Sequence, residues 1–237
     1  MKKLSLAILA ASLIAGPAFA LTDAELESAI SAKLETQLKD KAVADYTAEF
    51  IMENLLTWEG EPLELSEADS IMAFAFGNRL MENGNQVPGP MNEQLADTVV
   101  EVYKATGKPV YAQWEIAQSI GDRIPADKLF SINPVIAADG TLTYLSSIGV
   151  ADTAVQMAGG DLGKTVVVAF REHSLRTLTT AKAFGIDAYA PAGVELPHKY
   201  DTQSGQGWTR DQQTFVFHEL TYRSKAERDR LIKEANK

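Results

Sequence analysis

The residues best suited to chemistry follow the most apolar segment of the chain. Thr165–Phe170 reads TVVVAF and runs directly into Arg171, Glu172 and His173, with Arg176 three positions after the histidine. If a helix begins here, His173 and Arg176 share one face of its first turn. Free backbone N–H groups and the positive end of the helix dipole lie at the same place. The segment therefore predicts a site for a small anion.

Each of these residues has an expected role. His173 is the candidate acid or base, and Arg176 would stabilise negative charge. The positive end of the helix should lower the pKa of His173 and favour the neutral ring. A carboxylate from elsewhere, Glu115 or Asp201, would orient the imidazole. The alternative is structural: His173 would then be a helix-start residue hydrogen-bonded to a neighbouring loop.

Further candidates follow another apolar run or belong to one long irregular segment. Gly77 would let the backbone approach a ligand closely, unless it is a plain turn glycine. Arg79 and Glu115 have an alternative as surface charges, and Trp208 is either a lid or a hydrophobic plug. The full set of candidate ligand-binding residues is Gly77, Asn78, Arg79, Arg171, Arg176, Ser204, Trp208 and Arg210.

These residues can meet only if strands and helices alternate along the chain. The sequence predicts strands over 70–76, 110–114, 129–132, 165–170 and 186–190, and helices over 92–106, 150–157 and 173–184. Such alternation is typical of parallel βαβ units, and continuous apolar strands indicate a sheet covered on both faces. Ligands of open α/β sheets bind beyond the carboxyl ends of the strands. We expect a three-layer, Rossmann-like parallel sheet with an N-terminal helical pair and a C-terminal helix.

The flanking segments complete the expected organisation. Thr22 and Glu25 form a helix capping box, and Leu26, Ile30 and Leu34 recur at helical spacing, which indicates core positions. The predicted parts are a signal peptide over 1–20, an N-terminal helical segment over 21–62, an α/β core over 63–200, and a loop with a C-terminal helix over 201–237 packed on that core.

The first twenty residues have the three parts of a bacterial secretory signal. Two lysines precede a short apolar stretch that ends in Ala18-Phe19-Ala20. We expect cleavage before Leu21 and a periplasmic location, with no membrane insertion afterwards because no later segment is apolar enough. The net charge of −10 disfavours nucleic acid and anionic lipid as partners.

Residue types also exclude several kinds of site. The chain has no cysteine, which removes disulfides, thiolate nucleophiles and iron–sulfur clusters. His173, His198 and His218 match no local ligand spacing, so we expect no metal site.

The order of a strand ending in glycine, a helix, another strand and then TVVVAFREHSLR resembles the YdcF/SanA/ElyC family of bacterial α/β proteins. The matching positions are Gly77, His173 and Arg176, and the resemblance covers about residues 66–191. It implies a connection with the cell envelope. Some members are linked to S-adenosylmethionine, which an exported protein is not expected to meet, so the cofactor stays unknown.

The expected function is that of an exported, soluble periplasmic protein that binds a small anionic ligand and serves envelope biogenesis. If the protein is an enzyme, hydrolysis or group transfer is the natural class. The alternative is a non-catalytic binding or interaction module, with the N-terminal helices as the surface for an envelope protein partner. The effect of mutating His173 discriminates between the two.

Overall fold

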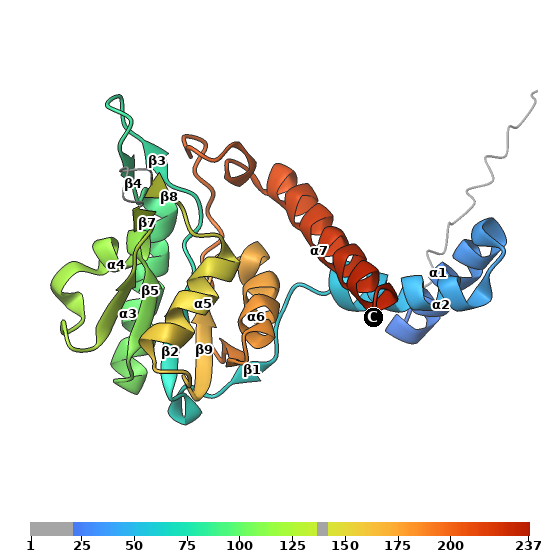
Figure 1. Cartoon of the computed structure of the whole chain (residues 1–237), viewed down its shortest axis with the longest axis horizontal. Helices are drawn as coiled ribbons and strands as arrows, with labels where there is room; N and C mark the ends of the chain where they lie inside the picture. The colour runs from blue at the N-terminus through green and yellow to red at the C-terminus, as the bar shows by residue number, and fades with distance from the viewer. Residues whose placement is uncertain (1–20, 137–141) are drawn as a thin grey trace, which may run out of the picture. The chain divides into compact units, whose positions relative to one another are not determined.

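The computed structural model describes residues 21–136 and 142–237, so the expected signal peptide lies outside the described residues. Its centre is a six-stranded sheet with the order β1-β10-β9-β2-β5-β6, and every neighbouring pair is parallel. The strands are β1 (Pro62–Leu63), β2 (Ser70–Ala73), β5 (Val110–Gln113), β6 (Leu129–Ile132), β9 (Lys164–Val168) and β10 (Asp187–Pro191). The expected Rossmann-like α/β fold is confirmed (Figure 1).

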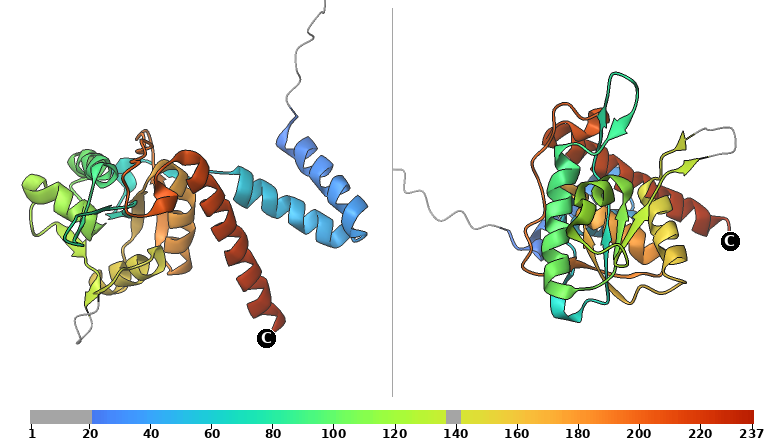
Figure 2. Two further views of the ribbon diagram at one scale, coloured as in Figure 1. Left: turned by 90° about the horizontal axis from the view of Figure 1, so that it is seen from above. Right: turned by 90° about the vertical axis from the view of Figure 1, so that its left-hand side faces the viewer.

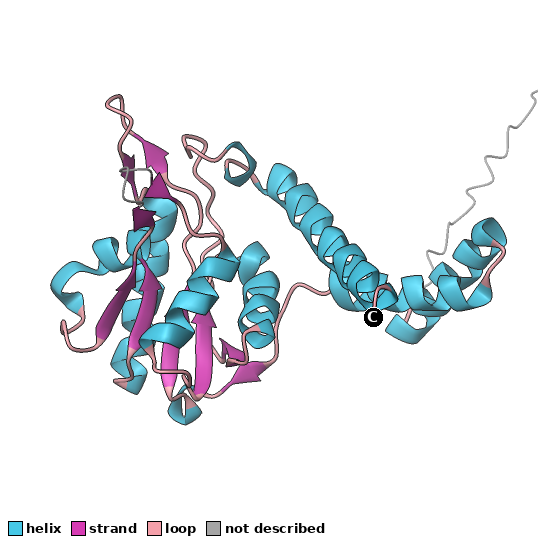
Figure 3. Cartoon of the chain, in the orientation of Figure 1, coloured by secondary structure: helices cyan, strands magenta, loops and turns pink. Residues whose placement is uncertain are grey.

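Helices connect and flank the strands (Figure 3). They are α1 (Asp23–Leu38), α2 (Lys41–Phe50), α3 (Pro90–Thr106), α4 (Trp114–Ile120), α5 (Ser147–Met157), α6 (Ser174–Ala183) and α7 (Gln212–Ala235). Two hairpins, β3 (Arg79–Leu80) with β4 (Gln86–Val87) and β7 (Val135–Ile136) with β8 (Leu142–Thr143), project from the same end of the sheet (Figure 2). Across the described ranges, no helix combines the length and hydropathy that crossing a bilayer requires.

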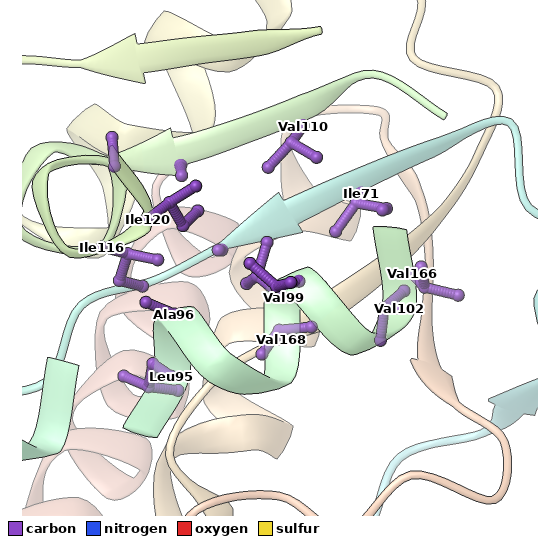
Figure 4. Close-up of a cluster of buried hydrophobic side chains, with 14 of the residues drawn as sticks. Ile71, Leu95, Ala96, Val99, Val102, Val110, Ile116, Ile120, Val166 and Val168 are labelled. Atoms are coloured by element: carbon purple, nitrogen blue, oxygen red, sulfur yellow. The ribbon is translucent and has the colours of Figure 1, made fainter. Parts of the chain in front are cut away.

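The sheet separates two apolar cores, which explains why its strands are apolar on both faces. Ile71 and Val166 pack with α3 and α4, as Figure 4 shows. Met72 and Val167, their neighbours along the strands, pack instead with α5 and α6. Because successive strand residues point to opposite faces, a polar residue at either position would be buried.

The strand order creates a switch point between β2 and β9. From β2 the chain adds β5 and β6 on one side, then α5 carries it back so that β9 and β10 add on the other side. The two connections leave the sheet in opposite directions at this point and open a crevice beyond the carboxyl ends of β2 and β9. The segments that follow these strands contain Gly77 and His173.

The chain divides into two compact units, one that ends at Glu53 and one over Asn54–Lys237. The division comes before the expected boundary at 62/63. Residues 54–62 belong with the second unit because Arg223 of α7 donates hydrogen bonds to the carbonyls of Asn54 and Thr57, and because β1 pairs with β10. Segment 201–237 belongs there too, and Phe215 of α7 lies in the core.

In the first unit, α1 and α2 form a helical pair. The capping box at Thr22 and Glu25 is present as predicted. The prediction that Leu26, Ile30 and Leu34 occupy a core is wrong, because no residue of α1 is buried. Within this unit α1 packs against α2, which covers part of the apolar stripe of α1 but not all of it.

Candidate functional site

A cavity of about 210 Å³ lies at the switch point. Its wall brings together Gly77 after β2, His173 and Arg176 after β9, and Trp208 from the long loop, four of the residues expected from the sequence. The other lining residues are Ala75, Phe76, Gln113, Tyr144, Leu145, Ser146, Ser147, Gln206, Thr209, Phe215 and Tyr222.

His173 is held in an apolar corner of this cavity. Its ring lies 6.0 Å from the rings of Phe76 and Phe215, and the residue is 5% exposed. Burial and the nearby Arg176 charge lower the pKa of His173 to about 4, so the imidazole is neutral at pH 7. Its Nδ1 lies 3.8 Å from Oε2 of Glu219, too far for a hydrogen bond but near enough to favour the tautomer with the proton on Nδ1. Nε2 then carries a lone pair, as a general base requires.

Arg176 is anchored by a buried carboxylate. Its Nε donates to Oε1 and Oε2 of Glu219 at 2.8 and 2.9 Å, and its Nη1 donates to the Ser147 hydroxyl at 3.4 Å. Its guanidinium carbon lies 4.4 Å from the centre of the Tyr222 ring. The planar group is therefore fixed in orientation against α7.

Glu219 is the carboxylate that orders this region. Burial on its own would raise its pKa, but His173 and Arg176 outweigh burial and lower the pKa to about 2. Arg223 also donates to its Oε1, at 3.3 Å. One carboxylate with two guanidinium groups leaves the cluster with one excess positive charge, which favours an anion nearby.

The first turn of α5 borders the cavity. Ser146 is the N-cap of this helix and accepts a hydrogen bond from the backbone N–H of Gly149. The earlier N–H groups of the turn have no partner within the helix, and they lie at the positive end of its dipole. Ser146 and Ser147 line the cavity, so this helix start lies beside Arg176.

Another part of the wall contains a buried acid behind a tyrosine. The Tyr144 hydroxyl donates to Oε1 of Glu115 at 2.5 Å and accepts from Nε2 of Gln113 at 3.0 Å. Gln113 is itself oriented by the backbone N–H of Ala75, which donates to its Oε1. Burial raises the pKa of Glu115 to about 7, although the Tyr144 hydrogen bond opposes the shift. Burial also raises the pKa of Tyr144, which stays a neutral phenol.

The remaining candidates fasten the long loop to the turn after β2. Asp201 accepts two hydrogen bonds from Arg79, at 2.7 and 3.0 Å, and the Arg79 guanidinium lowers the pKa of Asp201. The Ser204 hydroxyl donates to the carbonyl of Asn78, and Arg210 donates to the carbonyl of Ser204. These five residues do not line the cavity. They hold the loop that closes it.

Arg171 lies outside the cavity and pairs with Glu172 at 2.7 Å. Trp208 lies at the cavity rim, and its role as a lid or as a hydrophobic plug stays a prediction. Its ring stacks on His218 at 5.4 Å, yet the residue is 44% exposed at the cavity rim. His173 is thus faced by Glu219, whereas Glu115 and Asp201, the carboxylates expected to orient it, are engaged elsewhere.

Sequence reasoning missed Gln113, Tyr144, Gln206, Glu219 and Tyr222. One signal for α7 was present, because Phe215, Glu219 and Tyr222 recur at helical spacing and place an acid on an otherwise aromatic face. An acid on such a face needs a buried cation, and Arg176 is that cation. Tyr144 follows a short hairpin and carried no comparable signal.

Within the described residues, no group of three histidine and acidic side chains is arranged to hold a metal ion. No protein-family model, no curated protein and no solved structure matches the chain.

Proposed function

We propose that this protein is an exported, periplasmic α/β protein that binds a small anionic ligand, a phosphate or a carboxylate group, in the switch-point cavity. The observation that carries the proposal is the convergence of His173, Arg176 and the first turn of α5 on one small cavity. A fixed guanidinium and free N–H groups are the donors that such anions require. The excess positive charge around Glu219 acts in the same direction.

The geometry also supports hydrolysis or group transfer as the reaction class. Neutral His173 would accept the proton of a water molecule or a hydroxyl nucleophile at Nε2, while Glu219 stabilises the imidazolium that forms. Arg176 and the α5 donors would stabilise the charge that develops on the ligand. A cavity of about 210 Å³ accommodates the reacting group, with the rest of a larger ligand beyond the Trp208 rim.

A role in envelope biogenesis is part of the same proposal. It is supported by the export signal expected over 1–20 and by the resemblance of residues 66–191 to the YdcF/SanA/ElyC family. Both features come from the sequence.

The second candidate is a non-catalytic module that binds an envelope protein. It is favoured by the helical pair, where Leu38, Val43 and Tyr46 are exposed. In this case His173 would only strengthen ligand binding. Loss of an activity on mutation of His173, as opposed to weaker binding alone, separates the candidates.

The binding test is a thermal-shift screen of the protein that begins at Leu21 against phosphate, sugar phosphates, peptidoglycan fragments and nucleotides. A ligand at 100 times its Kd should stabilise the protein by about 2.7 kcal/mol. Binding should weaken as salt is added, because exposed charge interactions are screened. Selective binding of neutral sugars, unaffected by salt, would contradict the proposal.

The Arg176 and His173 variants locate the site. Arg176→Ala should lose a charge-assisted contact of about 1.5–3 kcal/mol in binding, and Arg176→Lys should recover little because lysine lacks the planar fork. His173→Gln should also weaken binding. His198→Gln is the matched control, since His198 lies outside the cavity beside Glu195. Unfolding must be measured on each variant, because Arg176 also neutralises buried Glu219. Unchanged affinity in all folded variants would place the site elsewhere.

A further inference from the structure

The cavity is connected to a buried acid through a single hydroxyl. Glu115 is fully buried, and its Oε2 makes no hydrogen bond among the described residues. Its other oxygen accepts the hydrogen bond of Tyr144, whose side chain lines the cavity. A buried carboxyl oxygen without a donor is costly when the group is ionised, so a change in protonation relieves that cost.

The Tyr144 hydroxyl has one proton and two lone pairs, and the protonation state of Glu115 determines in which direction the proton points. When Glu115 is ionised, the hydroxyl proton points to Oε1, the Gln113 amide donates to one lone pair, and the Gln206 side chain faces the other. When Glu115 is protonated, the acid itself can donate to the Tyr144 oxygen. The hydroxyl proton is then free to turn to the cavity. A lone pair repels an anion, whereas an O–H group binds one.

We propose that Glu115 takes up a proton when the cavity binds an anion, and that the Tyr144 hydroxyl then turns to the cavity and donates a hydrogen bond to the anion. The inference rests on the proposed anion site and names its pH-sensitive group. No covalent bond to the ligand forms or breaks: one proton passes from solvent to Glu115, and the Tyr144 hydroxyl rotates. Tyr144 contacts the anion, and Glu115 is a positioning residue that acts through it.

The groups near Glu115 allow it to titrate close to neutral pH. Burial raises its pKa to about 7, and the opposing contributions come from the Tyr144 hydrogen bond and from the backbone N–H of Glu115 itself. Gln113 on β5 and Gln206 on the long loop face Tyr144 and are uncharged.

Two ion pairs lie on the elements around Glu115 and Tyr144. Asp97 of α3, the helix packed on α4, is exposed and paired with Arg123 beyond the far end of α4. In the same cavity Arg176 is paired with Glu219 of α7, and His173 is neutral above pH 6. Glu115, which is linked to the cavity through Tyr144, therefore titrates between pH 6 and 8.

The experiment is sulfate titration by calorimetry from pH 6 to 8.5, in two buffers of different ionisation enthalpy. Sulfate stays fully ionised over this range, so any proton taken up goes to the protein. If only the form with protonated Glu115 binds, wild-type affinity should fall about tenfold from pH 6 to pH 8. Proton uptake should approach one per sulfate at the upper end.

Four variants test whether Glu115 causes the proton uptake and the pH dependence of sulfate binding. Glu115→Gln keeps the shape but cannot titrate, so its affinity should be the same at pH 6 and 8, with no proton uptake. Tyr144→Phe should bind sulfate about tenfold more weakly at pH 6, with little pH dependence. His173→Gln should bind more weakly but keep the pH dependence. Glu172→Gln, which alters another buried carboxyl with an unpartnered oxygen outside the cavity, should behave as wild type.

The outcomes separate this inference from the function on which it rests. Proton uptake that persists in Glu115→Gln overturns the inference. Sulfate binding that does not depend on pH in the wild type overturns it as well, but leaves the anion site intact. Absence of sulfate binding at every pH removes the anion site, and this inference with it.

Discussion

At the scale of single residues, two buried groups near the cavity, one base and one acid, have pKa values that are shifted in opposite directions. Burial and Arg176 lower the pKa of His173 to about 4, and burial raises that of Glu115 to about 7. Both shifts favour the neutral form, because neither group has a full counter-ion of its own. Their effects on folding stability have opposite pH dependence.

The stability that neutral His173 contributes to the folded state is fully present above pH 6.5, its ordinary pKa, and is lost as pH falls through about 4. The stability that neutral Glu115 contributes is fully present below pH 4.5 and is lost as pH rises through about 7. Relative to wild type, Glu115→Gln should gain on the order of 3 kcal/mol in unfolding free energy between pH 4.5 and pH 8. His173→Gln should show its relative gain on acidification below pH 6.5. Urea unfolding at several pH values measures both, and parallel wild-type and variant curves would contradict the assignment.

At the scale of elements, the turn after β2 and the long loop require each other. Gly77 has a φ of 64°, and a Cβ at this position would lie 2.7 Å from the Ser204 hydroxyl and 2.8 Å from that of Thr209. Asp201, held by Arg79, keeps the loop in that position. Glycine is thus required both by the backbone conformation and by the approach of the loop.

Gly77→Ala should therefore cost more stability than backbone strain alone. Gly84→Ala is the matched control, since Gly84 also has a positive φ, 81°, but nothing lies within 4 Å of an added Cβ. The control should lose about 1–2 kcal/mol. Gly77→Ala should lose clearly more and should expose the 201–210 segment to proteases. Equal losses in thermal unfolding would show that the loop adapts at little cost.

At the scale of the whole molecule, the cavity belongs to the second compact unit, and the helical pair forms the first. The cavity is built from the segments that follow β2 and β9, the end of β5, the starts of α5 and α6, the long loop and α7, which all lie within Asn54–Lys237.

Export is the prediction that belongs to the whole molecule. We expect cell fractionation to find the protein in the soluble periplasmic fraction, with Leu21 at its N-terminus, because residues 1–20 have the pattern of a cleaved signal. N-terminal sequencing of the purified protein checks the cleavage site. A membrane-bound species that still begins at Met1 would contradict the prediction.

The sequence by itself determined most strands and helices of the sheet, since a local apolar pattern encodes each: Thr165–Phe170 predicts β9, and 92–106 predicts α3. It did not predict the two-residue strand β1 or the short helix α4. It also placed His173, Arg176 and Gly77 at one edge, because strand ends of a parallel sheet converge there. Only the tertiary structure decided their partners. Glu219 reaches Arg176 from α7, and Tyr144 reaches Glu115 from beyond a hairpin. Which acid meets which donor depends on long-range packing and burial, and burial sets the charge of each group.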